Sequence, residues 1–112
     1  MVVDEYSDYR TTLCALIEQD GHPCTALARV EAAHAELDMF APDVVVLELS
    51  LPGATELLET LRDRGIGVVG IAHERQPPPV PADAIVIKGC AFAEIMRAIS
   101  FAHTAGQQRR AV

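Results

Sequence analysis

The sequence lacks tryptophan, has few aromatic residues and contains only three cysteines among its 112 residues. Cys14, Cys24 and Cys90 are odd in number and form no C-x-x-C pair, which argues against a disulfide framework and against a zinc site. Burial as small hydrophobic side chains explains these thiols better than redox chemistry. Because aromatic residues are scarce, the core has to be built mainly from valine, leucine, isoleucine and alanine.

Long apolar runs and an excess of basic residues are also missing. The hydrophobic stretches are short and interrupted by charges, which excludes a membrane-spanning helix, and no basic start with an apolar signal-peptide core follows Met1. A net charge of −7 repels a phosphate backbone, so we expect this domain to bind neither nucleic acid nor a membrane. These features predict a cytoplasmic protein, and 112 residues are enough for one domain only.

The most informative stretch is residues 43–53, which read Asp-Val-Val-Val-Leu-Glu-Leu-Ser-Leu-Pro-Gly. Four consecutive apolar residues followed by one carboxylate and a Pro-Gly turn predict a strand that is buried on both faces. In open α/β folds, side chains at the carboxyl ends of parallel strands line the functional crevice. Glu48 is therefore placed where a functional site is expected.

The rest of the chain alternates short apolar strands with amphipathic helices. We expect the other strands at residues 2–3, 22–28, 67–72 and 84–87, and Pro23 indicates that the second strand lies at a sheet edge. Helices are expected from a cap at Ser7 or Asp8 to Gly21, then at 30–40, 55–64 and from 91 to about 104. Prolines 77, 78, 79 and 81 forbid a regular helix in the connection 73–81.

This alternation requires a parallel sheet covered by helices on both faces. The strand ends then converge, and they carry Asp4, Glu5, Glu48, Ala72 and Lys88, which is the only lysine. We expect Asp4, Glu5 and Glu48 to form an acidic pocket facing Lys88. Because hard cations prefer oxygen ligands, weak Mg²⁺ binding by these three acids is possible, and we expect no other cofactor.

Three segments resemble the receiver domain of bacterial two-component response regulators, and the resemblance runs over nearly the whole chain. The segments are Val3-Asp4-Glu5, Leu47 to Gly53 and Ile87-Lys88. In that family an acidic pair helps to bind magnesium, and an aspartate at the end of the third strand accepts a phosphoryl group. A threonine or serine ends the fourth strand, and a lysine ends the fifth. The resemblance implies an α/β, flavodoxin-like (CheY-like) fold with a doubly wound five-stranded parallel sheet. Here a proline-rich loop shortens or replaces the fourth helix.

On this basis, residues 1–105 form a receiver-like domain and residues 106–112 form a polar tail or the start of a linker. Two segments are similar in sequence to receivers that are joined to LuxR-type helix-turn-helix output domains. They are Gly89-Cys90-Ala91 and residues 94–99. The resemblance therefore implies a possible DNA-binding output domain beyond Val112.

Two chemical positions depart from the family pattern, so Glu48, Ala72 and Lys88 make a degenerate phosphoacceptor site. Glu48 replaces the acceptor aspartate, and its extra methylene displaces the carboxylate from the position that in-line transfer needs. Ala72 replaces the hydroxyl residue and has nothing with which to bind a phosphoryl oxygen. Lys88 either pairs with Glu48, imitating its contact to a phosphoryl group, or acts as the counter-ion of the three acids.

We therefore predict an atypical, phosphorylation-independent receiver domain, with no catalytic residue and no enzymatic activity. It would act as a regulatory protein-interaction or dimerisation module in signal transduction or transcription control, with a protein partner or a second copy. One alternative is a small-ligand sensor that uses the same crevice, with contacts from His73 and Cys90. Another is a receiver that keeps residual phosphotransfer on Glu48.

Overall fold

The computed structural model describes residues 1–74 and 79–111, in which strands and helices alternate as the sequence predicts. The strands are β1 (Val2–Val3), β2 (Ala26–Leu27), β3 (Val44–Glu48), β4 (Gly67–Ala72) and β5 (Ala84–Ile87). The helices are α1 (Ser7–Gln19), α2 (Val30–Phe40), α3 (Ala54–Asp63) and α4 (Phe92–Arg110). The fold class is α/β, in agreement with the prediction.

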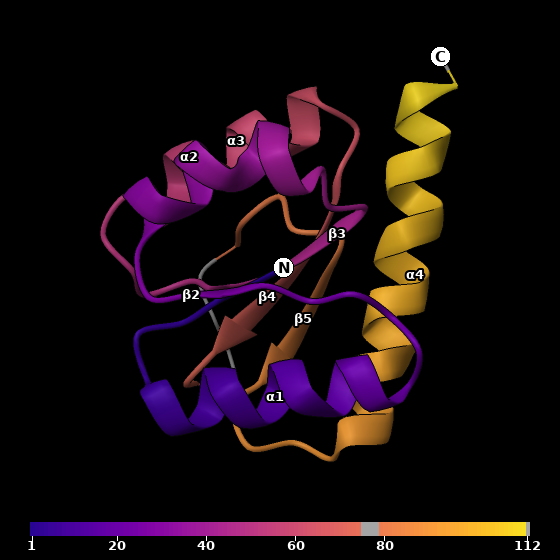
Figure 1. Ribbon diagram of the computed structural model, residues 1–112. Coiled ribbons are helices and arrows are strands. Elements are labelled where there is room, and N and C mark those ends of the chain that lie inside the picture. The colour runs from indigo at the N-terminus through magenta and orange to yellow at the C-terminus, as the bar shows by residue number, and fades with distance from the viewer. Residues whose placement is uncertain (75–78, 112) are drawn as a thin grey trace.

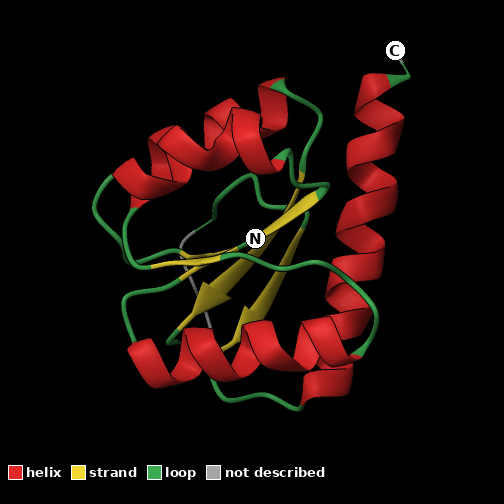
Figure 2. Cartoon of the chain, viewed as in Figure 1, coloured by secondary structure: helices red, strands yellow, loops and turns green. Residues whose placement is uncertain are grey.

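All five strands are parallel and lie in the order β2-β1-β3-β4-β5 (Figure 1). The predicted edge position of the second strand is confirmed, although β2 is only two residues long. The central strands β3 and β4 are buried along almost their whole length, as is the short β1, because helices cover both faces of the sheet (Figure 2). This explains why both strands are continuous apolar runs with no polar alternation.

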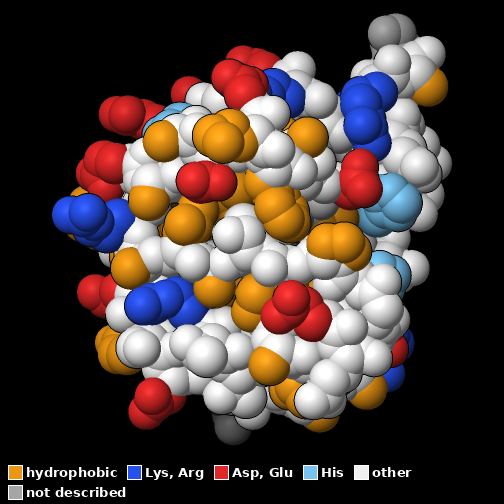
Figure 3. All heavy atoms as spheres, viewed as in Figure 1, with side chains coloured by type: hydrophobic (Ala, Val, Ile, Leu, Met, Phe, Trp, Pro, Cys, Tyr) orange, Lys and Arg blue, Asp and Glu red, His pale blue; other side chains and the backbone are white. Residues whose placement is uncertain are grey.

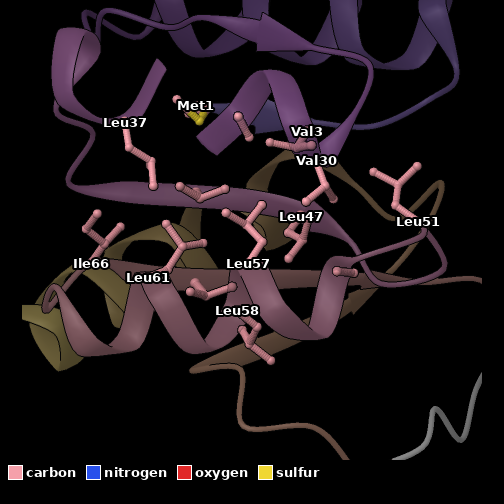
Figure 4. Close-up of a cluster of buried hydrophobic side chains, with 14 residues drawn as sticks. Met1, Val3, Val30, Leu37, Leu47, Leu51, Leu57, Leu58, Leu61 and Ile66 are labelled. Atoms are coloured by element: carbon pink, nitrogen blue, oxygen red, sulfur yellow. The ribbon is translucent and has the colours of Figure 1, made fainter. Parts of the chain in front are cut away.

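Each face of the sheet has its own hydrophobic core, because successive side chains of a strand point to opposite sides. Leu47 of β3 packs with α2 and α3, and Figure 4 shows Leu57 and Leu61 of α3 pointing toward this strand. Val46, its neighbour in sequence, packs instead with α1 and α4, where Ile95 is buried. Aliphatic residues fill both cores, as the scarcity of aromatic residues predicts.

Two details of the elements differ from the predictions. The predicted side-chain cap of α1 is wrong, since Ser7 is already helical and Tyr6 caps the helix without a side-chain hydrogen bond. As predicted, the connection before β5 forms no helix at residues 73–74 and 79–83, and residues 75–78 of the predicted proline-rich loop lie outside the described part of the chain. Within that described part, no helix is long and apolar enough to cross a membrane.

The second difference is the end of α4, which was predicted near Thr104 and lies at Arg110. The sequence 106–110 looks polar, yet Gly106 is buried against the backbone that leads into β4. Arg109 donates two hydrogen bonds to Asp83, of 2.6 and 3.0 Å, and these hold the last turns of the helix on the domain. The tail therefore begins as a docked helix, and the domain boundary at residue 105 stays a prediction.

Gly106 tests this docking. Alanine favours a helix by about 1 kcal/mol over glycine, but a Cβ at position 106 would lie 2.7 Å from Gly65 O and from Gly67 N. Because backbone cannot move aside cheaply, we expect Gly106→Ala to lower the free energy of unfolding by about 1–2 kcal/mol. Urea denaturation measures this.

Gln107→Ala is the control, because Gln107 is exposed on the same turn and should change stability by less than about 0.5 kcal/mol. A Gly106→Ala protein that is more stable than the wild type would show that the helix is not docked at this point.

Candidate functional site

Polar side chains from four strands meet at the carboxyl end of the sheet, toward which the arrowheads of β4 and β5 point in Figure 1. Asp4 follows β1, Glu48 ends β3, His73 follows β4 and Lys88 follows β5. The carboxylates of Asp4 and Glu48 are completely buried, with 0% of each side chain exposed. Parallel strands thus bring residues from distant parts of the sequence to one place, as predicted.

Asp4 is held by Lys88 and by its own loop. Lys88 Nζ lies 2.9 Å from Asp4 Oδ2 and donates a hydrogen bond of 3.0 Å to Oδ1. The Tyr6 amide donates to the same Oδ1 at 2.8 Å. Arg10 fixes this loop from the helix by donating to the carbonyl oxygens of Asp4 and Glu5, at 3.2 and 3.3 Å. The loop after β1 is therefore ordered by charge-assisted hydrogen bonds.

Glu48 has three neighbours within hydrogen-bonding distance. Ser50 donates its hydroxyl to Oε2 at 2.6 Å, and the Glu5 amide donates to Oε1 at 3.0 Å. His73 Nε2 lies 3.2 Å from Oε2. The carboxylate is thus bound by its own strand end, by the loop after β1 and by the residue that follows β4. It is a fixed acceptor with partners on three elements.

Lys88 interacts more closely with Asp4 than with Glu48. Its Nζ is 4.0 Å from Glu48 Oε1, at the limit of an ion pair, compared with about 3 Å from both oxygens of Asp4. The ammonium also lies over the Tyr6 ring, 3.9 Å from its centroid, and 4.7 Å from that of Tyr9. This geometry favours the counter-ion role of Lys88 over imitation of a phosphoryl contact.

The two buried acids have opposite pKa shifts. Burial raises the pKa of Asp4 in spite of the hydrogen bonds from Lys88 and from the Tyr6 amide, and the charge of Glu48 adds to this rise. Burial also opposes ionisation of Glu48, but hydrogen bonds from Ser50, from the Glu5 amide and from His73 outweigh it and lower the pKa of Glu48. Glu48 is therefore the better stabilised anion of the pair.

Glu5 and Ala72 contribute less to the site. The side chain of Glu5 is exposed, and only its amide reaches Glu48. Ala72 is buried at the end of β4, and its side chain is only a methyl group. The three predicted acids thus do not form one pocket of carboxylates: Asp4 and Glu48 are buried together, and Glu5 is not buried with them.

Magnesium fits this set of donors poorly. No three His, Cys, Asp or Glu side chains converge as metal ligands within residues 1–74 and 79–111. The ammonium of Lys88 lies within 3.0 Å of both oxygens of Asp4, and Glu48 already accepts hydrogen bonds on both of its oxygens. A divalent cation would have to displace these donors.

Ser50 and Tyr6 were not singled out in the sequence, and His73 was considered only as a ligand contact. Ser50 lies two residues after Glu48 in a Leu-Ser-Leu segment, where an isolated hydroxyl beside a buried acid was a usable signal. His73 directly follows the residue that ends β4, so its position among the strand ends was readable too. Nothing in the local sequence indicates that Tyr6 packs against Lys88.

No protein-family model matches the chain. No curated protein sequence matches it either. Among solved structures, NtrX from Brucella abortus, described in complex with ATP, is 20% identical with a TM-score of 0.83. The match covers 97% of this chain and 27% of NtrX.

Two further structures are similar. The signal receiver domain of a protein described as a LuxO repressor, from Vibrio parahaemolyticus, is 10% identical with a TM-score of 0.78, over 97% of this chain and 92% of that one. The response regulator StyR is 26% identical with a TM-score of 0.72, over 97% of this chain and 60% of StyR. The chain thus spans about a quarter of NtrX and three fifths of StyR, and it has the CheY-like fold of response-regulator receiver domains.

Glu48→Gln tests the energetic role of the buried carboxylate. The substitution keeps the size of the side chain but removes its charge, and the new amide group faces the donors on Ser50 and His73. At pH 7 we expect it to lower the free energy of unfolding by about 2 kcal/mol. Because the pKa of Glu48 is lowered by folding, its contribution is present above the unfolded pKa of about 4.3 and is lost as the pH falls through the folded value.

Denaturation of both proteins at pH 7 and near pH 3 measures this difference. Glu5→Gln is the matched control, since it removes an adjacent but exposed charge and should change stability by less than about 0.5 kcal/mol at either pH. Equal stability of Glu48→Gln and the wild type at pH 7 would contradict a stabilising role of the bound carboxylate.

Proposed function

We propose that the chain is an atypical receiver domain whose state is not set by phosphorylation of Glu48. It would act as a regulatory protein-interaction or dimerisation module in signal transduction or transcription control. The receiver fold supports the general role. The observation that carries the specific proposal is the engagement of Glu48 by Ser50, the Glu5 amide and His73.

A phosphoryl acceptor has to present a carboxylate oxygen in line with the leaving group. Both oxygens of Glu48 face donors inside the protein, and the carboxylate is completely buried. Attack would therefore require Glu48 to leave these partners and to lose their stabilisation of its anion. This cost supports a structural role and ranks residual phosphotransfer on Glu48 below it.

The path by which a phosphoryl group would act on the rest of the fold is changed as well. A methyl group stands at Ala72, so no hydroxyl at this position can bind an added phosphoryl oxygen. His73 instead connects the end of β4 to Glu48 without any modification. In this proposal, internal hydrogen bonds hold the strand ends in one arrangement permanently.

The outer surface of α4 supports a role in protein contacts. Phe101 is 64% exposed there, beside Arg97 and Thr104 in a shallow depression. Large exposed aromatic side chains are typical of contact surfaces, and arginine is enriched at them. The partner is a different protein or a second copy. Because the sequence of residues 89–99 is similar to that of LuxR-type receivers, we also propose a DNA-binding output domain beyond Val112. The gene sequence past this residue tests this proposal.

Incubation with acetyl phosphate and Mg²⁺, followed by intact-mass measurement, tests the proposal directly. We expect no acyl phosphate on the wild type and an unchanged sedimentation coefficient, because Glu48 is engaged. The double variant E48D/A72T restores the residue types of the family pattern and tests whether these two positions account for the loss. A stoichiometric acyl phosphate on wild-type Glu48 would overturn the proposal.

The proposal includes at most weak magnesium binding by Asp4, Glu5 and Glu48. If the Kd exceeds about 10 mM, then Mg²⁺ at about 10 mM stabilises the fold by less than about 0.4 kcal/mol and raises the Tm by no more than about 3 °C. Thermal melts with and without Mg²⁺ measure this shift. A larger, saturable rise that Glu5→Ala abolishes would contradict it and would assign Glu5 to a metal site.

A further inference from the structure

A cavity of about 420 Å³ lies between α1 and α4, at the end of the sheet opposite to Glu48. Its lining includes Val44, which begins β3, whereas Glu48 ends the same strand. A rise of about 3.3 Å per residue separates the two positions by roughly 13 Å. The cavity is therefore distinct from the crevice around Glu48, and nothing in the proposed function depends on it.

The walls of this cavity are mainly apolar. Val46 and Ile17 are buried at its base, and Met96 and Ile99 of α4 form one side. Phe40, at the end of α2, adds a half-buried aromatic ring. In Figure 3, hydrophobic side chains spread over the middle of the face turned to the viewer, and histidine side chains lie at its right. Apolar walls at this size are typical of small-molecule sites.

The charges around the opening limit the kind of ligand. Among the described residues that line the cavity, none is lysine or arginine, and the one carboxylate is that of Asp43, which is exposed. His22 lies 3.4 Å from Asp20, so its imidazole already has an acidic neighbour. Ser100 and His103 supply hydrogen-bonding side chains on α4. The α-ammonium of Met1 also lies in the lining, but it already donates to the Val44 carbonyl oxygen at 3.1 Å, and burial lowers its pKa. It therefore attracts an anion only weakly, whereas an uncharged molecule would lose little solvation on entering the cavity.

We propose that this cavity binds a small, uncharged, largely apolar molecule with at most one polar group, which Ser100 or His103 would contact. Its volume falls in the range of about 300–1,000 Å³ that holds compact organic ligands. The ligand would touch α1, β3 and α4 at once. Binding would therefore stabilise the native chain by mass action and would add contacts between α4 and the rest of the domain.

Fluorescent probes of similar shape and different charge test the inference. The neutral probe is N-phenyl-1-naphthylamine, and the anionic probe is 8-anilino-1-naphthalenesulfonate. We expect the neutral probe to saturate one site per chain with a Kd of about 10–100 μM and the anionic probe to bind about tenfold more weakly.

Tryptophan substitutions on α4 locate the site. Met96→Trp fills the cavity, and Ser100→Trp blocks its rim from an exposed position where a larger side chain does not disturb the core. Each variant should weaken binding of the neutral probe at least about tenfold. Phe101→Trp is the matched control, because Phe101 is exposed on the same helix but does not line the cavity, and it should change the Kd by less than about twofold. The wild type has no tryptophan, so each variant also carries a single fluorescent reporter of its fold.

Four results would overturn the inference. Absence of saturable binding would exclude a small-molecule site, and equal binding by folded wild-type, Ser100→Trp and Phe101→Trp proteins would place the probe elsewhere. Tighter binding of the anionic probe would exclude the proposed ligand class. A dimer that Ser100→Trp dissociates and Phe101→Trp does not, measured by sedimentation without any probe, would identify a second copy as the occupant instead.

Discussion

The burial of two carboxylates at the carboxyl end of the sheet is the constraint on which this end of the fold depends. Asp4 and Glu48 have no exposed side-chain surface, and a buried charge without partners would cost several kcal/mol. Lys88 balances the charge of Asp4. The carboxylate of Glu48 is instead stabilised by the Ser50 hydroxyl, the Glu5 amide and the His73 imidazole. These partners come from the loops after β1, β3, β4 and β5, so one electrostatic requirement orders four chain segments together.

In the proposed function, this arrangement separates the architecture of a receiver domain from its usual chemistry. The sheet order and the strand ends are retained, yet the central acid is occupied by internal donors and the end of β4 carries only a methyl group. A buried network of this kind favours one conformation more than it raises the free energy of unfolding. The reason is that the desolvation cost of each charge offsets much of its attraction to its partners. The same residues that suggest a reactive centre in the sequence thus form a buried hydrogen-bonded network in the structure.

The alternation of strands and helices was predictable because it depends on local periodicity, and α2, β4 and β5 have the predicted bounds. The convergence of Asp4, Glu48 and Lys88 followed from the parallel topology alone. The exposed side chain of Glu5 and the preference of Lys88 for Asp4 depend on rotamers and on burial, which sequence spacing does not encode. The end of α4 was missed because Arg109 pairs with Asp83, a residue 26 positions away, and because a glycine that looks like a helix terminator at 106 serves close packing.

The docking of α4 has a further consequence for the length of this helix. Residues 95 and 98 are buried at one end of α4, whereas Gly106 and Arg109 make their contacts at the other. Each residue of an α-helix turns the following ones by about 100°. A single insertion or deletion between these two groups would rotate Arg109 away from Asp83 and would bring a bulkier side chain to the place of Gly106. In this fold, α4 can therefore accept changes of composition much more easily than changes of length.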